Sequence, residues 1–409
     1  MAEQGVLQQI FREHWGCVGK RLAKVFPKDV AVAARVAVEK LLVCGTAALG
    51  FVQFRCESCG ELHRECFTCK SRMCPRCGRV SAAEAAAQAQ GRLLNVNHRH
   101  LTFAVPAELR PLLFGHRELL GVVAHAAAAA TVEAIGTRCK RYPPMPGVMA
   151  TVHTFGRDLG FHVHVHVLCT AGGLREDGVW QPVKIFPAKQ YRRLWQYYLL
   201  KLLRQKLKGD RGAQRLIGSL HRKYSGGFIV NVMSQYKNGR KAAAYCCRYT
   251  GRPPISEKRI LDYDGEQVRI GYKDYRDGQD KELVLSADEF LLRLLQHVWP
   301  RYQRAVHYYG LYQPSRRKQH FRKVVEASRY AQQALPVPAL PRWQRLLLAV
   351  GVKEFVCQKC QQAMVLDKIR FRKRSYGAQV SKGTGPPGGA GTPGGSGPQL
   401  TLPLSPVWI

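Results

Sequence analysis

The sequence predicts an α+β protein, in which an N-terminal zinc-binding module precedes a larger domain with a central antiparallel sheet flanked by helices. Three observations predict this arrangement. Eight of the fourteen cysteines lie within the first 90 residues. Between about residues 95 and 315, apolar runs alternate with polar turns, as the elements of a mixed domain do. Beyond residue 376 the chain is dominated by Gly and Pro, which predicts a flexible tail.

Each element follows from a local pattern. Alanine-rich or long apolar runs predict helices at 79–94, 115–135 and 241–250. Short apolar or alternating runs predict strands at 100–105, 147–155, 161–171 and 226–235. The segment GRDLG joins the second and third of these strands as a hairpin. Gly251, Pro253 and Pro254 end the last helix, because proline cannot continue a helical hydrogen-bond ladder.

The charge of the chain is strongly positive. It contains 64 Lys and Arg against 28 Asp and Glu, a formal net charge of +36, and the basic residues recur along nearly the whole length. Such a surface attracts polyanions, and nucleic acid is the partner that this charge favours. A solvated basic surface or a ribosome-associated protein is the alternative interpretation.

The sequence favours a cytosolic protein. The N-terminal run MAEQGVLQQIFREHW lacks the apolar core of a signal peptide. No stretch reaches the roughly 18 apolar residues of a membrane span, and the run VVAHAAAAATVEAI, with His125 and a glutamate, predicts a buried helix instead. In that compartment clustered thiols indicate metal binding more often than disulfides.

Two cysteine pairs carry the strongest metal signal. Cys56-x-x-Cys59 and Cys74-x-x-Cys77 are separated by fourteen residues, and glycine follows each pair. This spacing is typical of a zinc ribbon, in which two knuckles converge on one tetrahedral ion. The sequence therefore predicts a structural zinc held by these four thiolates.

Further potential ligands lie nearby. Cys44, His63, Cys66 and Cys69 could build a second zinc site, or some could be buried thiols that pack like small hydrophobic residues. The pair Cys357 and Cys360 has no second pair near it in sequence. It could complete a zinc site with another region, pair across two chains, or have no metal role.

Three histidines occupy alternate positions in FHVHVHVL. His162, His164 and His166 would share one face of a strand, where they would repel when protonated and need partners when neutral and buried. A divalent cation resolves both problems, because neutral imidazole is a good metal ligand. His153 on the preceding strand is a further candidate if the hairpin register places it opposite His162 or His164.

A pair of tyrosines follows in KAAAYCCRYTGRPPIS. Tyr245 and Tyr249 are four residues apart on the predicted helix, so their hydroxyls would leave the same face about 6 Å apart. Arg248 and Arg252 flank them and could bind a phosphate. An aromatic stripe packed into a core is the alternative.

The order of these features resembles the HUH endonuclease superfamily. Within it, the chain is most similar to the insertion-sequence-91 family of rolling-circle transposases. The segments that carry the resemblance are SCGELHRECFTCKSRMCPRC, HTFGRDLGFHVHVHVLCTAGG and YCCRYTGRPPIS, followed by YKDYRDG and FLLRLLQHVWPRYQRAVHYYGLY. They keep their order over roughly residues 15 to 312.

The resemblance implies that different segments of the chain have different functions. Expected segments are a zinc-binding DNA-binding module at 1–92, a HUH-type domain at 93–315, a basic segment with CxxC at 316–375 and the tail at 376–409. His164 and His166 would hold a catalytic Mg²⁺ or Mn²⁺, with His162, His153 or a distant acid or amide as third ligand. Zinc would stay with the cysteines.

The resemblance also implies a reaction. Tyr245 or Tyr249 would attack single-stranded DNA at the ends of a mobile element, giving a 5′-phosphotyrosine and a free 3′-hydroxyl. The chain would bind no membrane, could act as a homodimer, and would lie in a prokaryotic cytoplasm near the nucleoid. A plasmid replication initiator or relaxase, and a non-catalytic zinc-dependent nucleic-acid-binding protein, are the alternatives.

Overall fold

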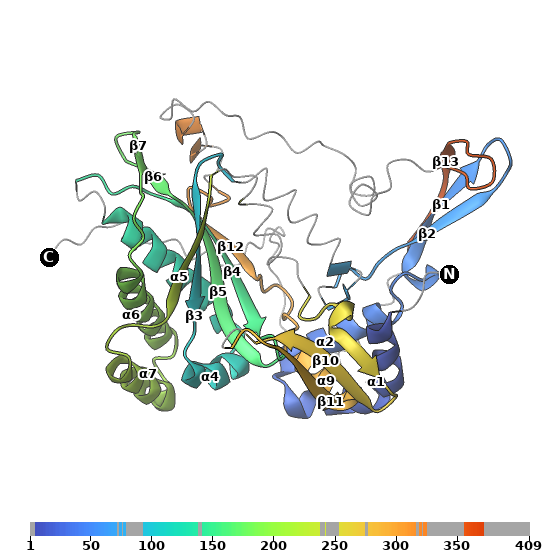
Figure 1. Cartoon of the computed structure of the whole chain (residues 1–409), viewed down its shortest axis with the longest axis horizontal. Coiled ribbons are helices and arrows are strands. Elements are labelled where there is room, and N and C mark those ends of the chain that lie inside the picture. Colours follow the sequence, from blue (N-terminus) through green and yellow to red (C-terminus); the bar gives the residue numbers. More distant parts are fainter. Residues whose placement is uncertain are drawn as a thin grey trace, which may run out of the picture. The chain divides into compact units, whose positions relative to one another are not determined.

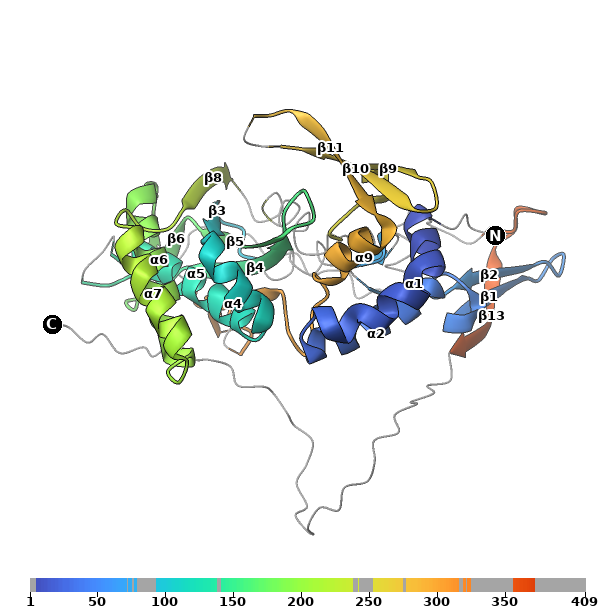
Figure 2. The same cartoon turned by 90° about the horizontal axis from the view of Figure 1, so that it is seen from below.

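The computed structural model combines helices with antiparallel sheets, which confirms the predicted α+β class (Figures 1 and 2). It describes residues 5–71, 73–75, 77–78, 93–137, 141–237, 242, 253–274, 277–315, 319–320, 322–324 and 356–371. The helices predicted at 79–94 and 241–250 lie mostly outside these ranges, and the tail at 376–409 lies wholly outside them.

A five-stranded antiparallel sheet contains the histidine strand at its centre. Its strand order is β12-β4-β5-β3-β8. The strands are β3 (His98–Ala104), β4 (Gly147–Phe155), β5 (Phe161–Thr170), β8 (Val230–Tyr236) and β12 (Val306–Gly310). The first four correspond to the predicted strands, whereas β12 has no predicted counterpart.

Helices cover one face of this sheet. α5 (Leu119–Gly136) contacts β4, β5 and β12, while α6 (Ala188–Lys206) contacts α5 and β8, and α7 (Arg211–Lys223) packs on α6 (Figure 1). The side chains of Val163, Val165 and Val167 belong to the core that these helices share with the sheet. Because side chains alternate along a strand, the three histidines of β5 face away from the helices.

Helix α5 is apolar on all sides. Among the described residues it is the helix with the length and hydropathy of a membrane span, and 78% of that window is buried inside the protein. Its five consecutive alanines, 126–130, are buried against neighbouring elements. The structure thus confirms the buried helix that the sequence predicts for this run.

A second core joins the N-terminal helices to a three-stranded sheet. The helices are α1 (Val6–Val25), α2 (Lys28–Leu42) and α9 (Ala287–Leu295). The sheet has the order β11-β10-β9, with β9 (Ile260–Tyr263), β10 (Gln267–Lys273) and β11 (Asp280–Ser286). Ser286 caps α9, because its hydroxyl accepts a hydrogen bond from the Glu289 amide at 3.3 Å.

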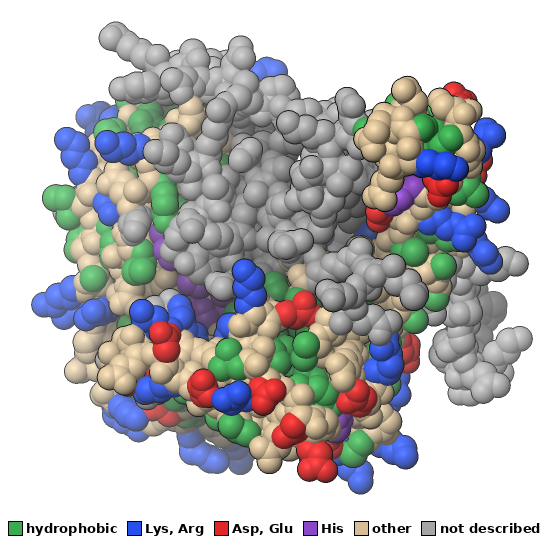
Figure 3. Space-filling model, turned by 45° about the vertical axis from the view of Figure 1, so that its right-hand side comes forward, with side chains coloured by type: hydrophobic (Ala, Val, Ile, Leu, Met, Phe, Trp, Pro, Cys, Tyr) green, Lys and Arg blue, Asp and Glu red, His purple; other side chains and the backbone are tan. Residues whose placement is uncertain are grey.

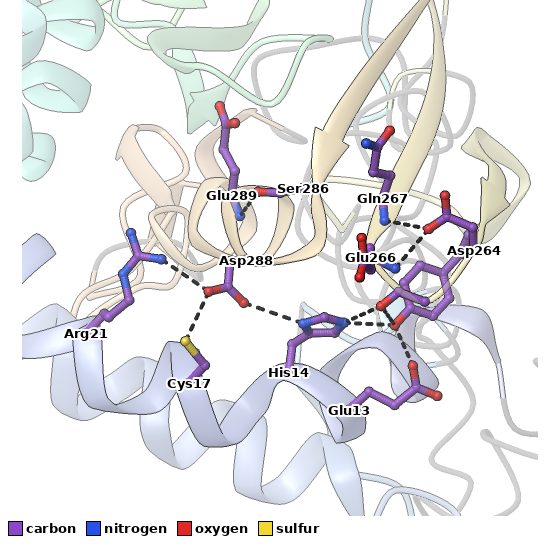
Figure 4. Close-up of polar contacts among 12 residues, drawn as sticks. Glu13, His14, Cys17, Arg21, Asp264, Glu266, Gln267, Ser286, Asp288 and Glu289 are labelled. Carbon is purple, nitrogen blue, oxygen red and sulfur yellow. Dashed lines mark hydrogen bonds and ion pairs between the residues drawn. The ribbon is translucent and has the colours of Figure 1, made fainter.

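A polar network links α1 to this second sheet and α9 (Figure 4). His14 Nε2 lies 2.9 Å from the Tyr263 hydroxyl, and His14 Nδ1 lies 3.5 Å from Asp288. Arg21 and Cys17 donate to the same Asp288 carboxylate at 3.2 and 3.1 Å. The carboxylate raises the pKa of the Cys17 thiol, so this cysteine stays protonated in a structural contact.

A third sheet joins two strands of the N-terminal module to the last described strand of the chain. Its order is β13-β1-β2, with β1 (Gly50–Cys56), β2 (Leu62–Cys66) and β13 (Met364–Phe371) (Figure 1). β13 pairs with β1 from Gly50↔Phe371 to Cys56↔Met364. Residues 364–371, which the sequence assigned to a separate basic segment, therefore form part of the sheet of the N-terminal module.

Short elements complete the described chain. They are η1 (Ala47–Leu49), η2 (Ala107–Leu109), α4 (Arg110–Gly115), β6 (Gly172–Leu174), β7 (Trp180–Pro182) and η3 (Glu257–Arg259).

The buried His297 makes the stability of the fold depend on pH. Its Nε2 lies 3.0 Å from the Leu159 carbonyl and its Nδ1 3.2 Å from the Thr154 hydroxyl. Burial lowers the pKa of His297 to about 3, from an ordinary 6.5. Between these values only the unfolded chain takes up the proton, so the folded state loses stability as the pH falls.

We expect His297→Gln to reduce this loss. Between pH 7 and pH 5 the free energy of unfolding should fall by about 2 kcal/mol less in the variant than in the wild type. Urea unfolding at the two pH values measures the difference. An equal loss in both proteins would contradict the assignment of this pH dependence to His297.

Candidate metal-binding and active site

The register of the central hairpin places a fourth histidine on the histidine face. His153 of β4 lies directly opposite His164 of β5, and Thr151 lies opposite His166. The sequence made His153 a candidate ligand if it lay opposite His162 or His164, and this register places it opposite His164. Neighbouring positions of β4, including Val152, belong to the core on the opposite, helix-covered face.

Three of these histidines converge. In His153, His164 and His166, one potential ligand atom of each residue lies within 4.8 Å of those of the other two. The ring centroids of His153 are 5.2 Å from those of His164 and 4.7 Å from those of His166. Three imidazoles at this spacing fit one divalent cation, because each can offer a nitrogen lone pair to a shared centre.

His162 lies beside this group. Its ring centroid is 5.5 Å from that of His164, and the group of potential ligands found among the described residues does not include it. Instead, the carbonyl oxygen of His162 lies 3.1 Å from His164 Nδ1. A proton on Nδ1 would be donated to this carbonyl, which leaves the lone pair of His164 Nε2 for a metal.

His100 on β3 contacts the group from the other side. Its Nε2 lies 3.0 Å from His166 Nδ1, and the Thr102 hydroxyl lies 3.4 Å from the same nitrogen. Partners of this kind fix the ring orientation of a metal-binding histidine. Sequence reasoning missed His100, although His100 opens the strand predicted at 100–105 and shares a strand face with Thr102.

The histidines are held in the neutral form that binds metals. Burial lowers the pKa of His164 to about 4, and burial together with His153, His164 and His100 lowers that of His166 well below 6.5. Burial is also the main reason for the lowered pKa of His162, with Arg110 adding to it. At neutral pH, a cation would not have to displace protons from His164 or His166.

The predicted tyrosines and arginines lie outside the described residues. This holds for Tyr245 and Tyr249 and for Arg248 and Arg252. Residues on either side of the tyrosine segment, residues 243–252, are described. Ala242 is fully buried in a core with Met149 and Leu168, which are on the histidine face of β4 and β5.

The first cysteine group lies in the core of the N-terminal module. The sulfur atoms of Cys44, Cys69, Cys74 and Cys77 all lie within 4.8 Å of one another. Cys77 Sγ is 3.6 Å from Cys44 Sγ and 3.4 Å from Cys69 Sγ. The Gly78 amide donates to the Cys74 carbonyl at 2.7 Å, which closes the knuckle turn. Four convergent thiolates are a suitable ligand set for structural zinc.

The second cysteine group combines one cysteine pair of the N-terminal module with the cysteine pair near the C-terminal limit of the described chain. It contains Cys56, Cys59, Cys357 and Cys360, whose sulfur atoms also lie within 4.8 Å of one another. The prediction that Cys56, Cys59, Cys74 and Cys77 share one ion is therefore wrong. β1 ends at Cys56, and the turn before β2 keeps Cys59 at this far end of the hairpin. Cys74 and Cys77 lie with Cys44 and Cys69 instead, while Cys56 and Cys59 lie with the C-terminal pair.

Other predicted zinc ligands lie elsewhere. His63 of β2 contacts Glu65, with 3.1 Å between Nε2 and the carboxylate. Among the groups of potential ligands in the described part of the chain, neither His63 nor Cys66 appears. These two residues are thus not brought into either four-cysteine cluster.

The helices beside the main sheet present a basic surface. Neither α6 nor α7 contains an acidic residue. Their exposed Lys and Arg residues include Lys189, Arg192, Arg193, Lys201, Arg204, Lys206, Arg211, Arg215, Arg222 and Lys223. The exposed side chains of these two helices suit the phosphate backbone of nucleic acid. On the face drawn in Figure 3, Lys and Arg side chains lie mainly toward the edges, Asp and Glu side chains gather in the lower part, and a few histidine side chains are visible.

Comparisons with known proteins agree with this arrangement. Residues 10–105 match the family model of a transposase zinc-binding domain, and residues 147–320 match that of a putative transposase. The chain is similar to the transposase for insertion sequence element IS801 of Pseudomonas savastanoi pv. phaseolicola, with 33% identity over 80% of this chain and 82% of that protein. It is 28% identical to the putative transposase y4qJ of Sinorhizobium fredii, over 69% of this chain and 75% of that protein.

No solved structure gives a significant match to the chain. The family models cover the first cysteine group and the histidine strand, and the relatives extend over most of the sequence. The chain belongs to the insertion-sequence-91 family of transposases and carries that family's N-terminal zinc-binding domain.

Proposed function

We propose that the protein cleaves and rejoins single-stranded DNA at the ends of a mobile element, through a covalent 5′-phosphotyrosine, in a rolling-circle type of transposition. The observation that carries the proposal is the convergence of His153, His164 and His166 on one face of the central sheet. The similarity to transposases supports DNA as the substrate.

The histidines supply a site for a catalytic cation, Mn²⁺ or Mg²⁺. A divalent cation bound there would polarise a phosphate oxygen and stabilise the charge that develops on phosphorus. Mg²⁺ prefers oxygen ligands, whereas the site offers three imidazoles. We therefore expect Mn²⁺ to support cleavage at lower concentrations than Mg²⁺.

Chain connectivity supports the tyrosines as nucleophiles. Tyr245 follows Ala242 by three residues, a reach of at most about 11 Å for an extended backbone, and Ala242 is buried beside the histidine face. After the tyrosine segment, Pro253 lies against the first cysteine knuckle, since a Cβ added to Gly78 would be 2.7 Å from Pro253 Cδ. The described residues that flank the tyrosine segment, Ala242 and Pro253, are thus both held by packing.

The proposed reaction conserves the energy of the DNA backbone. A tyrosine hydroxyl loses its proton, and its oxygen forms a bond to phosphorus while the bond from phosphorus to the 3′-oxygen breaks. The departing oxygen takes up a proton and becomes a free 3′-hydroxyl. Because a phosphodiester is exchanged for another phosphodiester, a 3′-hydroxyl can later attack the tyrosyl phosphate and rejoin the strand without ATP.

End-labelled DNA tests this function. We expect a single-stranded oligonucleotide that covers an element end to give, with Mn²⁺, a 5′-labelled fragment that a polymerase can extend. The 3′-labelled fragment should migrate with the protein under denaturing conditions, and chelation by EDTA should prevent both products. A 3′-labelled fragment with a free 5′-phosphate would contradict the proposed intermediate.

Phenylalanine variants test the two tyrosines. We expect Tyr245→Phe with Tyr249→Phe to form no adduct, because neither side chain retains the oxygen that attacks phosphorus. If either tyrosine can act first, each single variant should still form an adduct on the remaining tyrosine. If only one can act first, the variant that lacks this tyrosine should form no adduct. Tyr272→Phe, on the separate strand β10, is the matched control and should keep wild-type yield. An adduct in the double variant would exclude both tyrosines.

A further inference from the structure

The second cysteine group is built from two matching turns. In the first, the Gly60 amide donates to the Cys56 carbonyl at 2.9 Å, and the Cys56 amide donates to the Glu61 carbonyl at 2.9 Å. In the second, the Gln361 amide donates to the Cys357 carbonyl and the Cys357 amide to the Gln362 carbonyl, both at 2.8 Å. The two CxxC segments therefore share one backbone hydrogen-bond pattern.

The backbone dihedrals match as well. Gly60 and Gln361 follow the second cysteine of their segments directly, and their φ angles are +76° and +60°. Glycine adopts this left-handed region readily, whereas glutamine does so at a cost. A glutamine held in the same conformation as the equivalent glycine indicates that the second turn is constrained to the geometry of a metal-binding knuckle.

The two turns face each other at a distance that suits a shared ion. Cys56 Sγ lies 3.3 Å from Cys360 Sγ, and Cys59 Sγ lies 3.5 Å from Cys357 Sγ and from Cys360 Sγ. These separations exceed the roughly 2.05 Å of a disulfide. They approach the roughly 3.8 Å between ligands of a zinc tetrahedron with Zn–S bonds of about 2.3 Å.

The surrounding sheet holds the turns in place. β1 leads into the first turn and pairs with β2 beyond it, while β13 follows the second turn and pairs with the other edge of β1. A bridge between Val356 and Ala363 closes the second turn into a small hairpin. Cys56 and Cys357 are 1% and 0% exposed, although most of β13 is exposed to solvent. Among the described residues of the second turn, all except Cys357 and Cys360 are exposed, so the turn has no hydrophobic core of its own to fix it.

We propose that Cys56, Cys59, Cys357 and Cys360 bind a second structural zinc ion, which fastens the C-terminal segment 356–371 to the N-terminal zinc-binding module. The module is then discontinuous in sequence, and each knuckle of this zinc ribbon comes from a different end of the chain. The match to the zinc-binding family model ends at residue 105, so it does not include the C-terminal pair. The proposal does not depend on the DNA-cleaving activity.

Metal content of the full-length chain tests the proposal. We expect two zinc ions per wild-type chain, and one in Cys357→Ser/Cys360→Ser. Cys17→Ser and Cys66→Ser, which change cysteines outside both four-cysteine groups, are the matched controls and should keep two. One zinc ion in the wild type, or two in the double variant, would overturn the proposal.

Hydrogen exchange separates loss of this site from general unfolding. In the double variant, we expect the amides of Cys357 and Gln361 and those of β13 to lose protection, while the Gly78 amide in the first cysteine group keeps it. Dilution of the wild-type protein to the monomer tests whether the two cysteine pairs come from one chain or from two chains. Retention of both zinc ions by the monomer is expected, and release of one on dissociation would place the two knuckles on different chains and contradict the proposal.

Discussion

Replacing His164 or His166 with alanine is expected to reduce DNA strand cleavage by about a thousandfold or more. Each tenfold change in rate corresponds to about 1.4 kcal/mol, and charge stabilisation by a bound cation contributes several kcal/mol. Either substitution removes one of three converging imidazoles. Initial rates of cleavage of a single-stranded oligonucleotide at saturating Mn²⁺ measure the effect.

The neighbouring histidines provide a matched comparison. His153→Ala should cause a loss of the same order as His164→Ala, because His153 belongs to the converging group. His162→Ala should retain most activity, since the contact of His162 with His164 Nδ1 uses a backbone carbonyl that alanine also has. A larger loss in His162→Ala than in His153→Ala would contradict this ligand set.

Serine at Cys74 is expected to unfold the N-terminal module. Structural zinc contributes on the order of 10–16 kcal/mol in zinc-finger peptides, which exceeds the stability of most domains. Cys69, Cys74 and Cys77 are also part of the core that α1, α2 and α9 share, so the damage should spread to these helices. Zinc content and thermal unfolding measured by circular dichroism report the loss.

Cys17→Ser is the control for this variant. Cys17 is exposed on α1 and contacts Asp288 through a hydrogen bond that a serine hydroxyl can also donate. It should retain both the wild-type zinc content and the thermal transition. Wild-type zinc content in the Cys74 variant would show that the first cysteine group does not hold the metal.

Periodicity made the histidine face predictable. A strand alternates its side chains, so His162, His164 and His166 had to share one face whatever the rest of the fold was. The ligand set needed more information. His153 joins the group because of the register His153↔His164, and the pairing shifts between His153 and Phe155, close to the turn. Such a shift moves side chains between faces, and sequence spacing does not reveal it.

The partners of the cysteine pairs could not be predicted from spacing. Each CxxC segment forms a knuckle by local hydrogen bonds, and its sequence specifies that turn but not the opposing pair. Cys56 and Cys360 are separated by 304 residues, and they meet because β13 pairs with β1. β13 is mostly exposed, so it lacks the apolar alternation that would have indicated its place in the sheet.

The most direct test of the proposed strand-cleavage reaction is the identity of the residue that carries the DNA. Wild-type protein incubated with single-stranded element-end DNA and Mn²⁺ can be digested with nuclease and trypsin, and the modified peptide sequenced by mass spectrometry. We expect a nucleotide attached through its 5′-phosphate to Tyr245 or Tyr249. An adduct on any other residue, or cleaved DNA with no protein attached, would contradict it.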